Sequence, residues 1–270
     1  MDKVSPSSFD RGRWLRRCLT SLFCISPLSL GLGAISLSQS EARSIGHKIW
    51  QNECNGTVAG LTSWNAGENF ASLGIGHFIW YPEGVNGPFD ESFPKLVRFM
   101  QQRETKTFSF LSGPCPWHSR ADFLSAQQST EMKQLRDLLA ATVDLQTQFL
   151  INRLDEALPK MLAQAEGGER EKIRGNFQRL TRSPSGCYAL IDYVNFKGEG
   201  TLATERYAGQ GWGLLQVLER MPEGADNAPG QFSQAAAMVL RQRVKNAPPA
   251  RHEDRWLSGW IRRVNGYSRP

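Results

Sequence analysis

The sequence predicts a mainly helical α+β fold: a short N-terminal helix, a small β-hairpin or sheet, and a larger helical body. Three observations support this prediction. Apolar residues follow a helical spacing soon after residue 43, two β-like runs lie between residues 61 and 81, and helical spacing returns from residue 129 onwards. Strand-like and helix-like segments are therefore segregated along the chain, as in α+β proteins. With 270 residues and 40% hydrophobic content, the chain is long enough to bury a sizeable core.

The first predicted helix carries a carboxylate on its apolar face. Ile45, Ile49 and Glu53 are spaced i, i+4 and i+8, and Asn55-Gly56 ends the helix. Removal from water disfavours the charged form of a carboxylate, so a glutamate in such a position can hold a proton near neutral pH. A general acid needs this property. A helix-end glutamate that faces solvent or pairs with an arginine is the alternative interpretation.

The predicted hairpin follows directly. Residues 61–65 and 70–81 form its strands, joined by the turn-forming residues 66–69. The second strand contains Gly74 and Gly76, and paired glycines in a strand indicate close approach by a ligand or by another element. Glu68 and Ser72 supply polar groups on or beside this hairpin. Cleavage of a glycosidic bond requires such a second polar group opposite the acid.

The rest of the chain is predicted to be irregular first and then helical. Residues 82–117 form a Pro/Gly-rich loop and an aromatic, irregular stretch, and Pro159 marks a helix boundary or kink. Residues 166–174 form a polar connection. Further helices are expected at residues 188–196, 213–221, 232–244 and 255–264.

The N-terminus has the pattern of a secretory signal peptide. Four arginines between residues 11 and 17 precede an apolar, uncharged run at residues 18–38, and small residues follow. We expect a leader over residues 1–42, with an uncleaved membrane anchor as the alternative. Export predicts a periplasmic or secreted protein. In that oxidising setting, Cys54, Cys115 and Cys187 predict one disulfide and one buried thiol, with the pairing left open.

Charge and composition restrict which binding partners we expect. The net charge of +6 is spread along the chain, and no block of five like charges suggests a nucleic-acid arm. The cysteine spacing does not resemble a metal site. We therefore expect no metal, no cofactor and no nucleic-acid partner, and contact with a membrane only through an uncleaved N-terminal segment.

The order of these features resembles phage-type lysozymes (muramidases), which form glycoside hydrolase family 24 of the lysozyme-like superfamily. The residues that carry the resemblance are Glu53 at the helix end and Gly74-Ile75-Gly76-His77 after the hairpin turn. The family implies that Glu53 is the catalytic acid, that Ser72 replaces a threonine, and that Gly74, Gly76 and His77 support the site. The family's aspartate has no identical counterpart. Ala66 stands near its place, and Glu68 is the nearest carboxylate.

The C-terminal half extends the resemblance to this family. The matching segments are residues 195–200, 214–218, 235–237, 246–251 and 260–267. The resemblance implies that Arg251 pairs with the catalytic glutamate, and Asn195 is a candidate for binding substrate. It divides the exported domain, residues 43–270, into the catalytic helix and hairpin (43–90), a diverged helical region (91–186) and a C-terminal helical part (187–270).

We therefore expect an exported glycosidase that cleaves the glycan strands of bacterial peptidoglycan or a related amino-sugar glycan. A lytic transglycosylase and a chitosanase-type enzyme on the same scaffold are alternatives. Two further alternatives are a non-catalytic protein that binds glycan or cell wall and an envelope scaffold unrelated to sugars.

Overall fold

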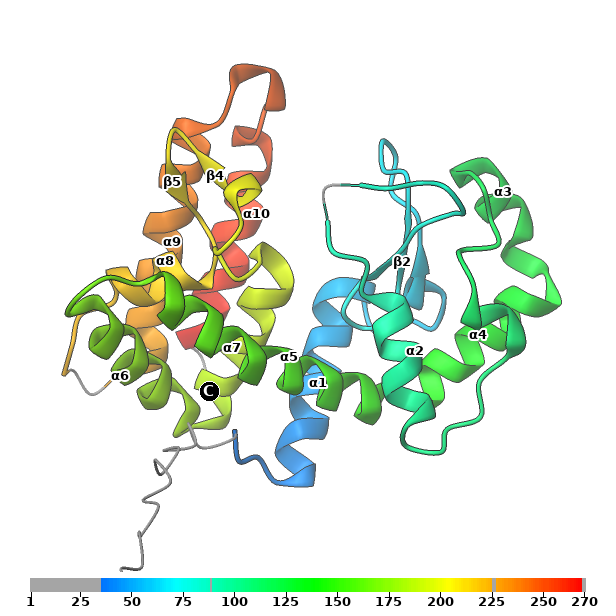
Figure 1. Ribbon diagram of the computed structural model, residues 1–270, viewed down its shortest axis with the longest axis horizontal. Coiled ribbons are helices and arrows are strands. Elements are labelled where there is room, and N and C mark those ends of the chain that lie inside the picture. Colours follow the sequence, from blue (N-terminus) through cyan, green and yellow to red (C-terminus); the bar gives the residue numbers. More distant parts are fainter. Residues whose placement is uncertain (1–34, 88, 225–226, 269–270) are drawn as a thin grey trace, which may run out of the picture. The chain divides into compact units, whose positions relative to one another are not determined.

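The fold is mainly helical with a small antiparallel sheet, which confirms the predicted α+β class (Figure 1). The computed structural model describes residues 35–87, 89–224 and 227–268. Of the expected leader, residues 1–42, the first 34 residues lie outside the described part of the chain. Among the described helices, none has the length and apolar character that crossing a membrane requires.

Helix α1 (Gln39–Cys54) begins before the expected end of the leader. Ser38 caps it: its hydroxyl accepts from the backbone N–H of Glu41, whose carboxylate accepts from the backbone N–H of Ser38 at 2.8 Å. Ahead of the cap, the backbone N–H of Ile35 donates to Asp155 at 3.3 Å. Asn55, with φ of 53°, ends the helix as expected. Residues 35–42 thus pack with the domain that was expected to start at residue 43.

The sheet has three antiparallel strands in the order β1 (Thr62–Ser63), β2 (Ala71–Leu73) and β3 (Phe78–Trp80). The expectation of one continuous strand over residues 70–81 is therefore wrong, because residues 74–77 form a turn between β2 and β3. Gly74, with φ of 68°, adopts the left-handed backbone that this turn requires.

Two expectations for the middle of the chain are corrected. Helix α2 (Phe93–Gln101) lies in the stretch expected to be irregular, and α6 (Glu169–Thr181) covers most of the expected polar connection. In α6, Ile173, Phe177 and Leu180 are buried at helical spacing, which stabilises a helix of polar composition. The other helices of this region are α3 (Arg120–Ser125), α4 (Thr130–Ala141) and α5 (Val143–Gln164).

Pro159 lies inside α5, not at a boundary. A proline removes one helical hydrogen bond, at a cost of about 3 kcal/mol. Leu154, Leu158 and Met161 are buried on both sides of it, and their packing keeps the segment helical.

The C-terminal half forms the four helices expected there, together with a two-stranded ribbon. Its elements are α7 (Pro184–Lys197), β4 (Arg206–Tyr207), β5 (Gln210–Gly211), α8 (Leu214–Arg220), α9 (Ala228–Asn246) and α10 (Asp254–Asn265). Short 3-10 turns cover Ala59–Leu61, Ser109–Ser112, Ala126–Gln128, Ala203–Glu205, Pro249–Arg251 and Gly266–Ser268.

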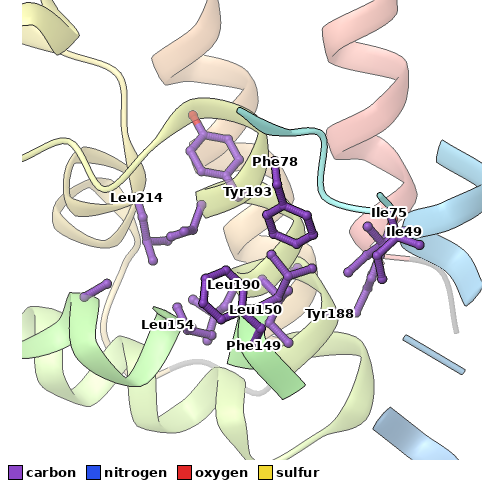
Figure 2. Packing of buried hydrophobic residues seen from close by; sticks show 14 of the residues in the cluster. Ile49, Ile75, Phe78, Phe149, Leu150, Leu154, Tyr188, Leu190, Tyr193 and Leu214 are labelled. Atoms are coloured by element: carbon purple, nitrogen blue, oxygen red, sulfur yellow. The ribbon is translucent and has the colours of Figure 1, made fainter. Parts of the chain in front are cut away.

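A hydrophobic core joins these elements, and α5 contacts α1, α2, α6 and α7. Figure 2 shows part of this core, with Ile49 of α1, Phe78 of β3, Phe149 of α5 and Tyr193 of α7. A buried polar side chain, Gln146 of α5, accepts the backbone N–H of Ile75 at 2.9 Å. The core therefore fixes the turn after β2 against the long helix.

The expected disulfide does not form among the described cysteines. Cys54, Cys115 and Cys187 are free and buried. Cys54 donates to the carbonyl of Gly74, the backbone of Cys115 pairs with Tyr81, and Cys187 lies in α7. Burial raises the pKa of Cys54 and Cys115 to about 12 and that of Cys187 to about 11. The three thiols are thus shielded in separate parts of the core and are poor nucleophiles.

Candidate active site

Glu53 lies in the last turn of α1, and its side chain is 12% exposed. One carboxylate oxygen accepts from the Nη2 group of Arg263 on α10. The other lies 3.3 Å from Nδ1 of His77, in the turn between β2 and β3. Segments that are far apart in sequence thus converge on this carboxylate.

Arg263 also binds a second carboxylate, that of Asp192 in α7. Its Nε and Nη2 groups each donate to Asp192 at 2.8 Å, which is a bidentate arrangement. Asp192 is completely buried, and the hydroxyl of Tyr267 donates to it at 2.5 Å. Burial alone lowers the pKa of Arg263, but the charge and hydrogen bonds of Asp192 and the charge of Glu53 raise it overall. The guanidinium is thus a fixed cation between two carboxylates.

Further contacts hold this network in place. The side chain of Asn52 donates to the Tyr188 hydroxyl at 2.5 Å and to Asp192 at 3.5 Å. The Arg263 guanidinium lies 4.2 Å from the centre of the Phe196 ring. Groups from α1, α7 and α10 therefore restrict the geometry around Glu53.

The expected pairing of Arg251 with Glu53 is not observed, since Arg263 takes that place. The Arg251 side chain is 60% exposed, and its nearest carboxylate, that of Glu253, is 4.0 Å away. Glu253 is itself bound by Arg243 at 2.7 and 2.8 Å. Arg251 lies in the 3-10 turn before α10, whereas Arg263 lies in the last turn of α10. The rise along α10 separates the two arginines.

His77 has a left-handed backbone, with φ of 48°. Few non-glycine residues adopt this conformation, and such residues cluster at functional sites. The side chain that this backbone presents is the one that contacts Glu53. His77 is therefore in direct contact with the candidate acid.

The sequence predicts that another element approaches the paired glycines closely, and side chains of this chain do so. A Cβ atom at Gly74 would lie 2.3 Å from the Gln146 side chain. At Gly76 it would lie 2.7 Å from the Phe78 ring and 3.2 Å from Oδ1 of Asn195. Asn195, at the end of α7, is thus brought against the turn that carries His77.

Glu68 lies in the turn between β1 and β2. Its carboxylate accepts from Asn65 at 3.0 Å, and its carbonyl accepts from the indole N–H of Trp64 at 2.8 Å. Burial raises the pKa of Glu68, against the hydrogen bond of Asn65 and the charge of His77. His77 thus contacts Glu53 directly, and its charge also acts on Glu68.

Ser72 lies in β2 and is only 4% exposed. It is paired with Ser63 and Ile79 on the neighbouring strands, and both are partly exposed. Directly paired residues share a face of the sheet, so Ser72 lies on its less buried face. Four aromatic residues in or next to the strands are buried: Trp64, Trp80, Tyr81 and Trp212.

Glu205, in the 3-10 turn Ala203–Glu205, has a structural role. Its carboxylate accepts from the backbone N–H groups of Gly200 at 2.7 Å and Leu202 at 3.3 Å. It therefore holds the loop after α7.

Asp192 and Arg263 were not predicted from sequence. One signal was present in each case. Asp192 is the only charged residue in the apolar run 187–194, and Arg263 continues the spacing of Trp256 and Trp260 on one face of α10. A charge on an apolar helix face needs a buried partner.

Within the described residues, no group of three or more His, Cys, Asp or Glu side chains is arranged to hold a metal ion. No protein-family model, no curated protein and no solved structure matches the chain. The observed class is therefore a mainly helical α+β protein, whose candidate site is a partly buried glutamate between an arginine and a histidine.

Proposed function

We propose that the protein is a glycosidase that cleaves the glycan strands of bacterial peptidoglycan, with Glu53 as the general acid. One observation carries the proposal: Glu53 is partly buried at a helix end and is held by Arg263 and His77 beside a hairpin that supplies a second carboxylate. Two carboxyl groups beside one cleavage point are what most glycosidases use.

The proposed chemistry assigns each group a role. As general acid, the Glu53 carboxyl group transfers a proton to the leaving glycosidic oxygen as the C–O bond breaks, and the sugar develops positive charge. Arg263 and His77 orient the carboxyl group. Glu68 stabilises the positive charge or activates a water molecule, and Ser72 supports that water. Asn195, beside Gly76, is placed to hydrogen-bond the sugar.

A lytic transglycosylase is the second candidate, favoured by Ala66 near the place of the expected aspartate. A lytic mechanism needs only the acid, since the sugar's own hydroxyl attacks and leaves an anhydro end. Glu68→Ala separates the two mechanisms. Retained cleavage with anhydro ends supports the lytic one, whereas loss of cleavage supports hydrolysis.

We further propose that the protein acts outside the cytoplasm, in the periplasm or as a secreted protein. The support is the basic and apolar pattern of the N-terminal sequence, together with a substrate that lies outside the cytoplasmic membrane.

The decisive experiment compares the purified full chain with its Glu53→Gln variant on isolated peptidoglycan. Glutamine keeps the shape but carries no transferable proton, so we expect product release to fall at least about 100-fold. Glu131→Gln, an exposed substitution on α4, is the matched control and should retain activity. Equal release by the native chain and Glu53→Gln would overturn the proposal.

The same assay distinguishes a chitosanase and a non-catalytic binding protein from this glycosidase. Cleavage of chitosan in preference to peptidoglycan would indicate a chitosanase. Sedimentation with cell walls without product release, unaffected by Glu53→Gln, would indicate a protein that binds the wall but does not cut it.

A further inference from the structure

One face of α10 carries an aromatic and cationic row that begins at the candidate site. Trp256, Trp260 and Arg263 are spaced i, i+4 and i+7, so they share a face of α10, and Tyr267 follows in the 3-10 turn after the helix. Their exposure increases along the row: Tyr267 is fully buried, the Arg263 side chain is 15% exposed, and Trp256 is 41% exposed. The row thus leads from the Glu53 network to the surface.

The side chains of this row and its neighbours are in contact. The Arg263 guanidinium lies 4.2 Å from the centre of the Phe196 ring, and the Phe196 and Trp260 ring centres are 6.3 Å apart, edge to face. The rings of Trp260 and Trp256 follow at 6.0 Å, with an angle of 31° between their planes. The contacts between Glu53 and Trp256 are therefore continuous.

Two basic side chains contact the Trp260 ring. Nζ of Lys197 lies 3.4 Å from its ring centre, and the Arg243 guanidinium lies 5.0 Å away. Arg243 is fixed in turn by its two hydrogen bonds to buried Glu253. An aromatic ring fixed in this way loses little further freedom when a ligand stacks on it.

The outer end of the row is cationic. The Arg255 guanidinium lies 4.4 Å from the centre of the Trp256 ring, and among the described residues it has no carboxylate partner. Arg251 is largely exposed, and Glu253, the carboxylate near it, is already bound by Arg243 and Tyr207. Arg255, with no carboxylate partner among the described residues, therefore lies beside an exposed indole.

We propose that Trp256, Trp260, Arg251 and Arg255 form a platform, the α10 platform, that binds an amino-sugar chain bearing carboxylate groups and leads it to Glu53. The indoles stack on sugar rings, and the arginines pair with carboxylates, which a guanidinium binds in bidentate fashion. At 1.5 Å per residue, Trp260 and Trp256 lie about 4.5 and 10 Å along the helix axis from Arg263. The platform rests on the proposed function and makes it more specific: a carboxylated glycan is preferred over neutral chitin or cationic chitosan.

Binding is tested in the Glu53→Gln background of the full chain, by sedimentation with isolated peptidoglycan. We expect Trp256→Ala to weaken binding about tenfold, the loss typical of a truncated tryptophan anchor. Met238→Ala, at a residue 44% exposed on α9, is the matched control and should bind normally. Both side chains are exposed, and a thermal melt of each variant checks the fold.

The charge requirement is tested on peptidoglycan whose carboxylates have been amidated, and on chitosan. We expect weaker binding of the native platform to both. Arg255→Gln should weaken binding to untreated peptidoglycan but make little difference on the amidated material. Arg241→Gln, an exposed arginine on α9, is the control for a general loss of charge.

The outcomes separate this inference from the proposed function. Unchanged binding by Trp256→Ala, or equal binding to amidated and untreated peptidoglycan, would overturn the platform. Product release is measured separately with Glu53 intact. If product is released but binding does not depend on Trp256, the proposed glycosidase activity is supported and the platform is refuted. If binding depends on Trp256 but no product is released, the platform is supported and the glycosidase activity is refuted.

Discussion

Replacing Arg263 by glutamine tests whether its charge holds the network around Glu53 together. The substitution removes the cation between Asp192, which is fully buried, and Glu53, which is 12% exposed. It also removes two hydrogen bonds to Asp192. Loss of one partner from a buried ion pair leaves an uncompensated charge and costs roughly 3–5 kcal/mol. For a domain of this size, we expect the midpoint of thermal unfolding, Tm, to fall by about 6–20 °C.

Urea unfolding followed by circular dichroism measures the free energy of unfolding. The control is Arg262→Gln, at the neighbouring position in α10. Arg262 is exposed and forms no ion pair with the residues described, so its loss should change stability by less than about 0.5 kcal/mol. A loss below about 1 kcal/mol for Arg263→Gln would contradict the argument from buried charge.

A second substitution separates charge from packing. Asp192→Asn, added to Arg263→Gln, removes the carboxylate that was left without its cation. We expect the double variant to be more stable than Arg263→Gln alone, because an amide costs less to bury than a charge. If the double variant is less stable, the loss arises from packing and not from the unpaired charge.

Three further predictions concern other parts of the molecule. In the folded protein, Cys54, Cys115 and Cys187 should resist alkylation, and all three should be labelled in denaturant without reductant; a cross-linked pair in peptide mapping would contradict this. A chain that begins at Arg43 should have a lower Tm than one that begins at Ile35, since it lacks the Ser38 cap (about 1 kcal/mol) and the packing of Ile35 and Leu37. Equal Tm values would show that residues 35–42 add nothing to stability. Burial, with the charge of Arg243, lowers the pKa of Lys197 to about 6, against 10.5 for a free lysine. The unfolded chain therefore binds more protons between these values, and Lys197 makes stability rise with pH over that range. Lys197→Met should remove the rise, and an unchanged pH profile would refute the assignment.

The fold class and the position of the candidate acid were predictable from the sequence alone. Helical spacing placed Glu53 on the apolar face of α1, and turn-forming residues placed Glu68 between two strands. These features follow from local periodicity and turn chemistry, which are visible within about a dozen residues. The helices of the C-terminal half were predictable for the same reason.

The residues around Glu53 depend on how distant segments pack together. Its arginine is Arg263, not Arg251, and Arg263 is bound in turn by Asp192. The choice between the two arginines depends on how α10 packs on α9, because this packing sets which arginine reaches α1 and α7, and no local pattern records it. The predicted disulfide was wrong for a similar reason. A disulfide needs a short distance between two cysteine side chains, and the core keeps these thiols apart. Glu53 was thus predictable because its helix places it, whereas its pairing with Arg263 depends on a contact over 210 residues of chain.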